Sequence, residues 1–433
     1  MKRLQPIMKF THIMLLVISI VLSACQSTGN SGFGTDGTTG APKVAILLPL
    51  SGSNAGLGKN LLNAAQMAVF QEAGPDFELI VKDTNQNGGA LAALQQAIDE
   101  GARLVLGPIF ANQVREITPL AASKGVQILS FSNDESLAKE GVFVGGLTLS
   151  QQINRIFHYV STQDIKRLAL LLPENNYGRV VESAAVQYAS AWGLEVFQTE
   201  FYDPSSKNFS ETVRKLGPGD PVPLASTEEE INQQNDSTGD LEQPEYQEQD
   251  TIDDVVVSSE PPPAWMPPYK PIKVVNYQAL LIAEGGERLI TLSALAPYHG
   301  IDTSQVRLLG TNLWDDPALQ REASLLGGWY PNYASQEKQL FEQQYRQLFG
   351  VQPNRLASNV YDMVTLAAKL GDKPGANFGR NAIINFGELS GKNGVFRFMP
   401  NGIAEYGLAI YEVQRQRILL KDPAPTTLLP LIN

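Results

Sequence analysis

Short apolar runs alternate with segments of helical periodicity along most of the chain. After residue 42, runs of about four to eight mostly apolar residues are followed by longer stretches whose apolar positions recur three or four residues apart. In 60–73, the positions on one helical face are Leu61, Ala65, Ala68 and Val69. The predicted strands are 43–50, 77–82, 103–106, 126–131, 142–147, 167–172, 194–201, 277–283 and 306–309, and the predicted helices are 60–73, 90–102, 112–124, 151–161, 179–192, 287–299, 335–349 and 356–370.

This alternation predicts the fold class. Apolar strands that alternate with helices are typical of parallel sheets covered on both faces. The rhythm restarts after residue 148, and near the end 394–398 and 405–420 flank a Pro-Asn-Gly turn typical of an antiparallel hairpin. We expect an α/β protein of two doubly wound lobes with a cleft between them. The expected parts are lobe 1 at 42–148 and 326–388, lobe 2 at 149–325 and 389–423, and a tail at 424–433.

The first 25 residues have the pattern of an export signal. Lys2, Arg3 and Lys9 precede an apolar run at 13–22 that is too short for an ordinary membrane-spanning helix. Leu-Ser-Ala-Cys25 follows and resembles the bacterial lipobox, in which the cysteine is diacylated. Cys25 is the only cysteine, so no disulfide can form within the chain. The alternative is an ordinary secretory signal with a leftover thiol. Residues 26–41 are rich in Gly, Ser and Thr, which predicts a flexible tether.

The formal charge of −12 is concentrated in one segment. Residues 216–269 hold thirteen acidic residues and no Lys or Arg. Without this segment and the signal, 45 − 13 = 32 acidic residues face 33 − 3 = 30 basic ones. We expect 217–270 to be a disordered, Pro-rich insertion in lobe 2, either a solvated loop or a contact for a basic partner. A nearly neutral body argues against nucleic-acid binding, which needs a basic face.

Several short motifs, in this order, carry a family resemblance. They are Leu-Leu-Pro-Leu-Ser51-Gly, Val-Leu-Gly107-Pro, Ile-Leu-Ser130-Phe-Ser, Asn-Tyr177-Gly, Leu-Leu-Gly310-Thr-Asn-Leu-Trp, Tyr361-Asp and Gly391-Lys-Asn-Gly-Val-Phe. Together they resemble the leucine/isoleucine/valine-binding-protein family, with the type I periplasmic-binding fold, over nearly all of the chain after residue 42. Within that group the chain is most similar to the penicillin-binding-protein activator lipoproteins.

The resemblance implies a non-enzymatic, lipid-anchored regulator that stimulates a peptidoglycan synthase. Gln26 after the cysteine favours, by resemblance to proteobacterial lipoproteins, the periplasmic face of the outer membrane, with the outer face of the inner membrane as the alternative. The alternative function is a substrate-binding lipoprotein of an ABC-type uptake system for amino acids or other small molecules. The partner would then be a transporter permease. The family's amino-acid binders carry a hydroxyl near position 111 and a carboxylate near position 312, where this chain has Ala111 and Asn312.

The candidate ligand-binding residues follow the ends of predicted strands, where doubly wound sheets bind ligands. Ser51 and the Phe110-Ala111 pair lead into helices, whose first N–H groups attract anions. Ser130 and Ser132 end a third strand and can donate to a carboxylate. The candidates are Ser51, Phe110, Ala111, Ser130, Ser132, Tyr177, Glu284 and Trp314. The alternatives are that Ser51 and Ser132 cap helices and that Tyr177 and Trp314 pack at the lobe interface or in the core.

The sequence offers little for catalysis. It has no nucleophile elbow, P-loop or His-Glu-x-x-His motif, and its three histidines, His12, His158 and His299, are far apart. We therefore expect no enzyme activity, no cofactor and no metal.

Overall fold

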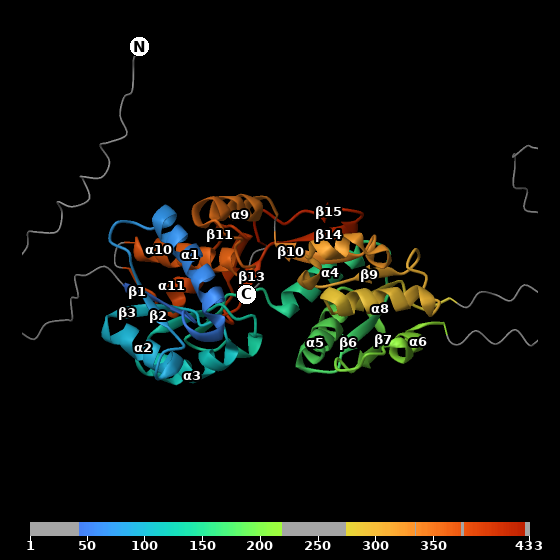
Figure 1. The fold of residues 1–433 in the computed structure, drawn as a ribbon, viewed down its shortest axis with the longest axis horizontal. Coiled ribbons are helices and arrows are strands. Elements are labelled where there is room, and N and C mark those ends of the chain that lie inside the picture. The colour runs from blue at the N-terminus through green and yellow to red at the C-terminus, as the bar shows by residue number, and fades with distance from the viewer. Residues whose placement is uncertain (1–42, 219–273, 334, 374–375, 429–433) are drawn as a thin grey trace, which may run out of the picture. The chain divides into compact units, whose positions relative to one another are not determined.

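A computed structural model describes residues 43–218, 274–333, 335–373 and 376–428. The signal with Cys25, the tether, and 219–270 of the acidic insertion lie outside the described residues. Two α/β lobes make up the described chain (Figure 1). Within the described residues, no helix is both long and apolar enough to span a membrane.

The first lobe contains a five-stranded parallel sheet in the order β2-β1-β3-β4-β5. Helices α1 and α10 cover one face of the sheet, and α2 and α3 cover the other. Its strands are β1 Lys43–Leu48, β2 Glu78–Asp83, β3 Ala102–Leu106, β4 Gln127–Ser130 and β5 Val142–Val144. Its helices are α1 Ala55–Glu72, α2 Gly89–Asp99, α3 Ala111–Ser123, α9 Ser335–Phe349, α10 Ala357–Gly371 and α11 Arg380–Ile384.

Strand β1 shows why this lobe has two helical layers. Val44, Ile46 and Leu48 are buried against α1 and α10, while Ala45 and Leu47 are buried against α2 and α3. Successive side chains of a strand point to opposite faces, so a continuously apolar strand needs cover on both.

The second lobe contains a seven-stranded sheet in the order β15-β14-β10-β9-β8-β6-β7. The strands from β10 to β7 are parallel, and β14 and β15 extend the sheet in antiparallel fashion. The strands are β6 Arg167–Pro173, β7 Glu195–Tyr202, β8 Ala279–Ile282, β9 Arg307–Leu309, β10 Trp329–Tyr333, β14 Leu408–Gln414 and β15 Arg417–Asp422. The helices are α4 Leu149–Ser161, α5 Asn176–Ala191, α6 Ser210–Leu216 and α8 Gly286–Tyr298.

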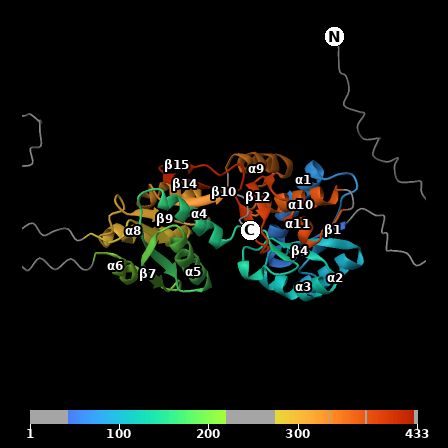
Figure 2. The ribbon, with the colours of Figure 1, turned by 180° about the vertical axis from the view of Figure 1, so that it is seen from behind.

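Two segments lie in a different lobe from the one that we expected. Strand β10 falls within 326–388, the range predicted for lobe 1, yet it pairs with β9 and β14 of the second sheet. The three-stranded sheet of β11 Leu389–Gly391, β12 Gly394–Phe398 and β13 Ala404–Tyr406 falls in the range predicted for lobe 2. Its Phe396, Phe398 and Tyr406 are buried in the core of lobe 1, and β12 lies beside α11 (Figure 2). Long-range burial decides both placements.

The predicted hairpin is confirmed for β12 and β13, which pair across the turn at 400–402. The expected strand at 405–420 is interrupted twice. Gly407 separates β13 from β14, and a turn in which Gln416 has a φ of 62° separates β14 from β15. The chain therefore crosses between the lobes three times, near 145–148, 334 and 407.

Candidate ligand-binding cleft

A cavity of about 430 Å³ is lined by residues of both lobes. From lobe 1 it receives Phe131 and Ser132, which follow β4, and Leu147, which follows β5. From lobe 2 it receives Tyr177 in the first turn of α5 and the segment 312–317 that follows β9. Its walls therefore lie at the carboxyl ends of strands, where ligands bind in open α/β sheets. The volume falls in the range of small-molecule sites, about 300–1,000 Å³.

Two of the predicted residues line this cavity. Ser132 is 7% exposed, and its Oγ accepts a hydrogen bond of 3.2 Å from the N–H of Asp134. Tyr177 places its hydroxyl 3.2 Å from Oγ1 of Thr311. Burial raises the pKa of Tyr177 to about 12, so its hydroxyl keeps its proton at physiological pH. Both residues combine contact with the cavity and a hydrogen bond within their own lobe.

Ser130 and Trp314 lie in the interior and do not line the cavity. The Oγ of Ser130 accepts the N–H of Ser132 at 3.0 Å and donates to the carbonyl of Pro108 at 3.4 Å. Trp314 is fully buried in the core of lobe 2. A Cβ added at Gly310 would lie 2.2 Å from its ring, so the glycine allows the indole to approach the backbone closely. We expected Trp314 in a ligand-binding wall, and the structure places it in the core.

The three candidates from the first two loops also lie outside the cavity lining. Ser51 is tied to the end of β2, because its carbonyl accepts the Nδ2 of Asn85 at 2.7 Å. Burial of Asp83 works against ionisation, but hydrogen bonds from Asn85, Ser51 and Leu50 lower its pKa. Phe110 is the residue before α3 and Ala111 is its first residue, and only their neighbour Ile109 reaches the cavity.

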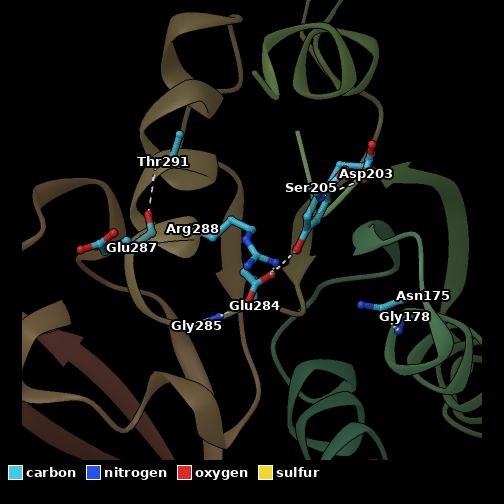
Figure 3. A network of polar contacts seen from close by, with 10 residues as sticks. Asn175, Gly178, Asp203, Ser205, Glu284, Gly285, Glu287, Arg288 and Thr291 are labelled. Atoms are coloured by element: carbon cyan, nitrogen blue, oxygen red, sulfur yellow. Dashed lines mark hydrogen bonds and ion pairs between the residues drawn. The ribbon is translucent and has the colours of Figure 1, made fainter. Parts of the chain in front are cut away.

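Glu284 follows β8 but its carboxylate is engaged within lobe 2. It accepts the hydroxyl of Tyr202 and the N–H of Gly285 at 3.0 Å, and it pairs with Arg288 at 3.1 Å. Figure 3 shows Glu284 beside Arg288 and Gly285 at the start of α8. Burial and the Glu284 carboxylate both raise the pKa of Tyr202. The cavity lining does not include Glu284, so a ligand there would meet other groups.

The polar lining consists largely of residues that sequence reasoning missed. They are Asn133, Gln152, Asn312, Asp315, Asp316, Asn332, Lys338, Arg355 and Asn359. Gln152 is 1% exposed, and its Oε1 accepts the N–H of Asn312 at 2.8 Å, which holds the segment after β9 against α4. The Asp315-Asp316 pair directly follows a motif that the sequence does single out, so extending the motif by two residues would have found it.

Within the described residues, no group of three or more His, Cys, Asp or Glu side chains is arranged to hold a metal ion. The polar lining is instead suited to hydrogen bonding and to contact with charged groups, since it contains amides, carboxylates, a lysine and an arginine.

Comparison with known proteins agrees with this architecture. Residues 41–220 match the family model described as periplasmic binding protein. A candidate branched-chain amino acid ABC transporter protein from Rhodospirillum rubrum superposes with a TM-score of 0.67 at 16% identity, covering 88% of this chain and 100% of that one. A branched-chain amino acid ABC transporter periplasmic ligand-binding protein from Burkholderia xenovorans gives 0.62 at 12% identity, covering 88% and 96%.

Two further relatives extend the comparison. A solute-binding protein of an ABC transporter from Rhodopseudomonas palustris, in complex with 3,4-dihydroxybenzoic acid, gives a TM-score of 0.55 at 16% identity, covering 89% of this chain and 98% of that one. An uncharacterized protein of Rickettsia prowazekii is 24% identical over 196 residues, which are 45% of this chain and 50% of the relative. The matched region thus spans about half the length of that relative.

The chain has the type I periplasmic-binding-protein fold, and the structures it resembles are substrate-binding proteins of ABC transporters. This family is generally non-enzymatic and acts in the periplasm.

Proposed function

We propose that the protein is a non-enzymatic solute-binding protein that captures a small polar molecule between its lobes and presents it to an ABC-type permease. The open, polar cavity carries this proposal. Its volume of about 430 Å³ suits a small solute, and side chains of both lobes contribute to its walls. A cleft filled by side chains would instead favour a role confined to protein docking.

The test is binding in solution. Thermal-shift screening of amino acids, hydroxy acids, sugars and polyamines should identify a stabilising class, and calorimetry should then give one site per chain. Ligand binding should also shift the lobes toward a closed state, seen as a smaller radius of gyration in X-ray scattering. Failure of every compound class to bind folded protein would contradict the proposal.

A second candidate is a regulator of peptidoglycan synthesis similar to the penicillin-binding-protein activators. It is supported by the engagement of Glu284 and Ser130, two groups at strand ends that hydrogen-bond within their own lobes. For this role we expect gentle pull-downs from the native envelope to recover a peptidoglycan synthase, and we expect the purified protein to increase the rate of that synthase. Recovery of a permease alone would favour solute delivery.

Both roles fit attachment to a membrane through a diacylglyceryl group on Cys25, which we propose on the lipobox pattern. Several buried acyl chains give a durable anchor, because each buried CH₂ contributes about 0.8 kcal/mol. Intact mass measurement of the mature protein from its host should find a lipidated amino-terminal cysteine in outer-membrane fractions. A Cys25→Ser variant should lose the modification, and a wild-type protein with an unmodified thiol would contradict the anchor.

A further inference from the structure

An unpaired acceptor lies in the wall of the cavity. Asn359 in α10 is 2% exposed and lines the cavity. Its Nδ2 donates to the carbonyl of Gly145 and to the hydroxyl of Tyr406, both at 2.7 Å. Its Oδ1 has no hydrogen-bond partner among the residues described. A buried acceptor without a donor costs free energy, so a donor that enters the cavity would be favoured there.

The surrounding contacts fix which amide atom remains unpaired. The carbonyl of Gly145 can only accept, so the Asn359 atom facing it must be the NH₂ group. The hydroxyl of Tyr406 donates its proton to that same carbonyl at 2.6 Å, and it therefore has none left for Asn359. A rotated amide would lose both hydrogen bonds. The free position is thus an oxygen that needs a donor.

An unpaired cation lines the same cavity. Arg355 lies just before α10, is exposed, and has no ion pair or hydrogen bond with any part of the chain that the structure describes. The other cation of the lining, Lys338, is held 3.3 Å from Oδ2 of Asp315. A guanidinium presents two parallel N–H groups that match a carboxylate, so Arg355 is the group able to receive an acid.

The acidic residues of the lining restrict where an anion can lie. Asp315 and Asp316 enter from lobe 2 and contribute negative charge to the same cavity. Asp315 pairs with Lys338, whereas Asp316 accepts the N–H of Ala318 at 2.9 Å. A ligand with one carboxylate can be directed to Arg355 and away from these acids, but a second carboxylate would meet repulsion on the lobe 2 side.

We infer that the cleft selects a small monocarboxylic acid that also carries a hydroxyl or ammonium donor, with its carboxylate at Arg355 and its donor at Oδ1 of Asn359. The inference rests on the proposed solute-binding function and names the class of solute. It places the main polar contacts at the start of α10, whereas the sequence motifs place them at Ser130 and Ser132.

Two matched sets of probes test the inference by calorimetry. The first set is L-leucine, L-leucinamide, which lacks the carboxylate, and 4-methylpentanoate, which lacks the donor. The second set is 3,4-dihydroxybenzoate and its decarboxylated counterpart catechol. We expect at least one parent acid to bind, and its counterparts lacking either group to bind at least tenfold more weakly, the range for hydrogen bonds to charged groups.

The Arg355→Gln variant should weaken binding of the parent acid at least tenfold, and Arg103→Gln, an exposed arginine near the start of β3, should leave it unchanged. Since Arg355 is exposed, its variant should fold, which circular dichroism verifies. If sugars or polyamines bind instead, or if Arg355→Gln leaves acid binding unchanged, the inference is overturned while the solute-binding function stands. If no compound of the probe sets or of the wider screen binds, both are overturned.

Discussion

The Nζ of Lys338 lies 3.3 Å from Oδ2 of Asp315, and this ion pair joins α9 of lobe 1 to the segment after β9 in lobe 2. The same Asp315 oxygen accepts the Nδ2 of Asn332 at 2.7 Å, close to one of the chain crossings. Both charged residues line the cavity. A pair that spans the lobes at the cleft wall favours conformations in which the lobes stay close.

Lys338→Met should therefore shift the ligand-free protein toward more open conformations. The Asp315 side chain is 41% exposed, so the pair should contribute under about 1 kcal/mol and be screened by salt. X-ray scattering at low salt should give a larger radius of gyration than for the wild type, with a smaller difference at high salt. Lys369→Met, which breaks the Lys369–Glu72 pair within lobe 1, is the control. Equal radii for Lys338→Met and wild type would contradict the role.

Tyr177 tests whether an aromatic face or a hydroxyl matters in the cleft. Tyr177→Phe removes only the contact with Thr311 at 3.2 Å, so ligand affinity should change less than about threefold. Tyr177→Ala removes the ring from the cavity wall and should weaken binding at least about tenfold. Calorimetry with the ligand found in screening measures both. A larger loss in Tyr177→Phe than in Tyr177→Ala would assign recognition to the hydroxyl.

Asp362 predicts a pH dependence of stability. It is fully buried, and burial raises its pKa to about 7 from 3.8, although its oxygens accept the N–H groups of Lys392 at 2.6 Å and Asn393 at 3.0 Å. The folded state therefore holds the proton more tightly than the unfolded state. The contribution of this group to unfolding free energy should be fully present below about pH 4 and fall by on the order of 2–4 kcal/mol as the pH rises to about 7.

Chemical denaturation across this pH range measures the effect. Asp362→Asn should be less stable at low pH because one backbone N–H loses its acceptor, and its deficit relative to wild type should shrink as the pH rises. Asp99→Asn, an exposed carboxylate on α2, serves as the control and should leave the pH profile unchanged. A wild-type advantage that grows with pH would show that the ionised carboxylate is favoured in the folded state.

Trp314 should act through stability. Because it is fully buried, Trp314→Ala should lower the unfolding free energy by about 3–5 kcal/mol. Gly310→Ala should also destabilise, since its Cβ would lie 2.2 Å from the indole. Phe70→Ala removes a ring that is 89% exposed and should change stability by less than about 0.5 kcal/mol. Guanidinium unfolding followed by circular dichroism tests all three, and a mild Trp314→Ala effect with lost ligand binding would restore Trp314 as a binding residue.

The sequence by itself determined most of the secondary structure and the fold class. Val44 and Ala45 belong to one apolar run, and that run forms a strand buried on both faces. The helix predicted at 335–349 has those bounds in the structure, and the turn at 400–402 joins the two predicted strands. These features depend on residues within a few positions of one another, so local pattern is sufficient to predict them.

Only the tertiary structure decided which groups share the cleft and which sheet each short strand joins. Asn359 reaches its partner Gly145 across 214 positions of sequence, and Arg155 of α4 donates to the carbonyl of Leu408 across 253. Ser130, at the end of a predicted strand, hydrogen-bonds within its own loop, whereas Arg355, which no motif marks, lines the cavity. Local pattern sets the shape of an element, but the contacts of a side chain depend on elements that the topology brings beside it.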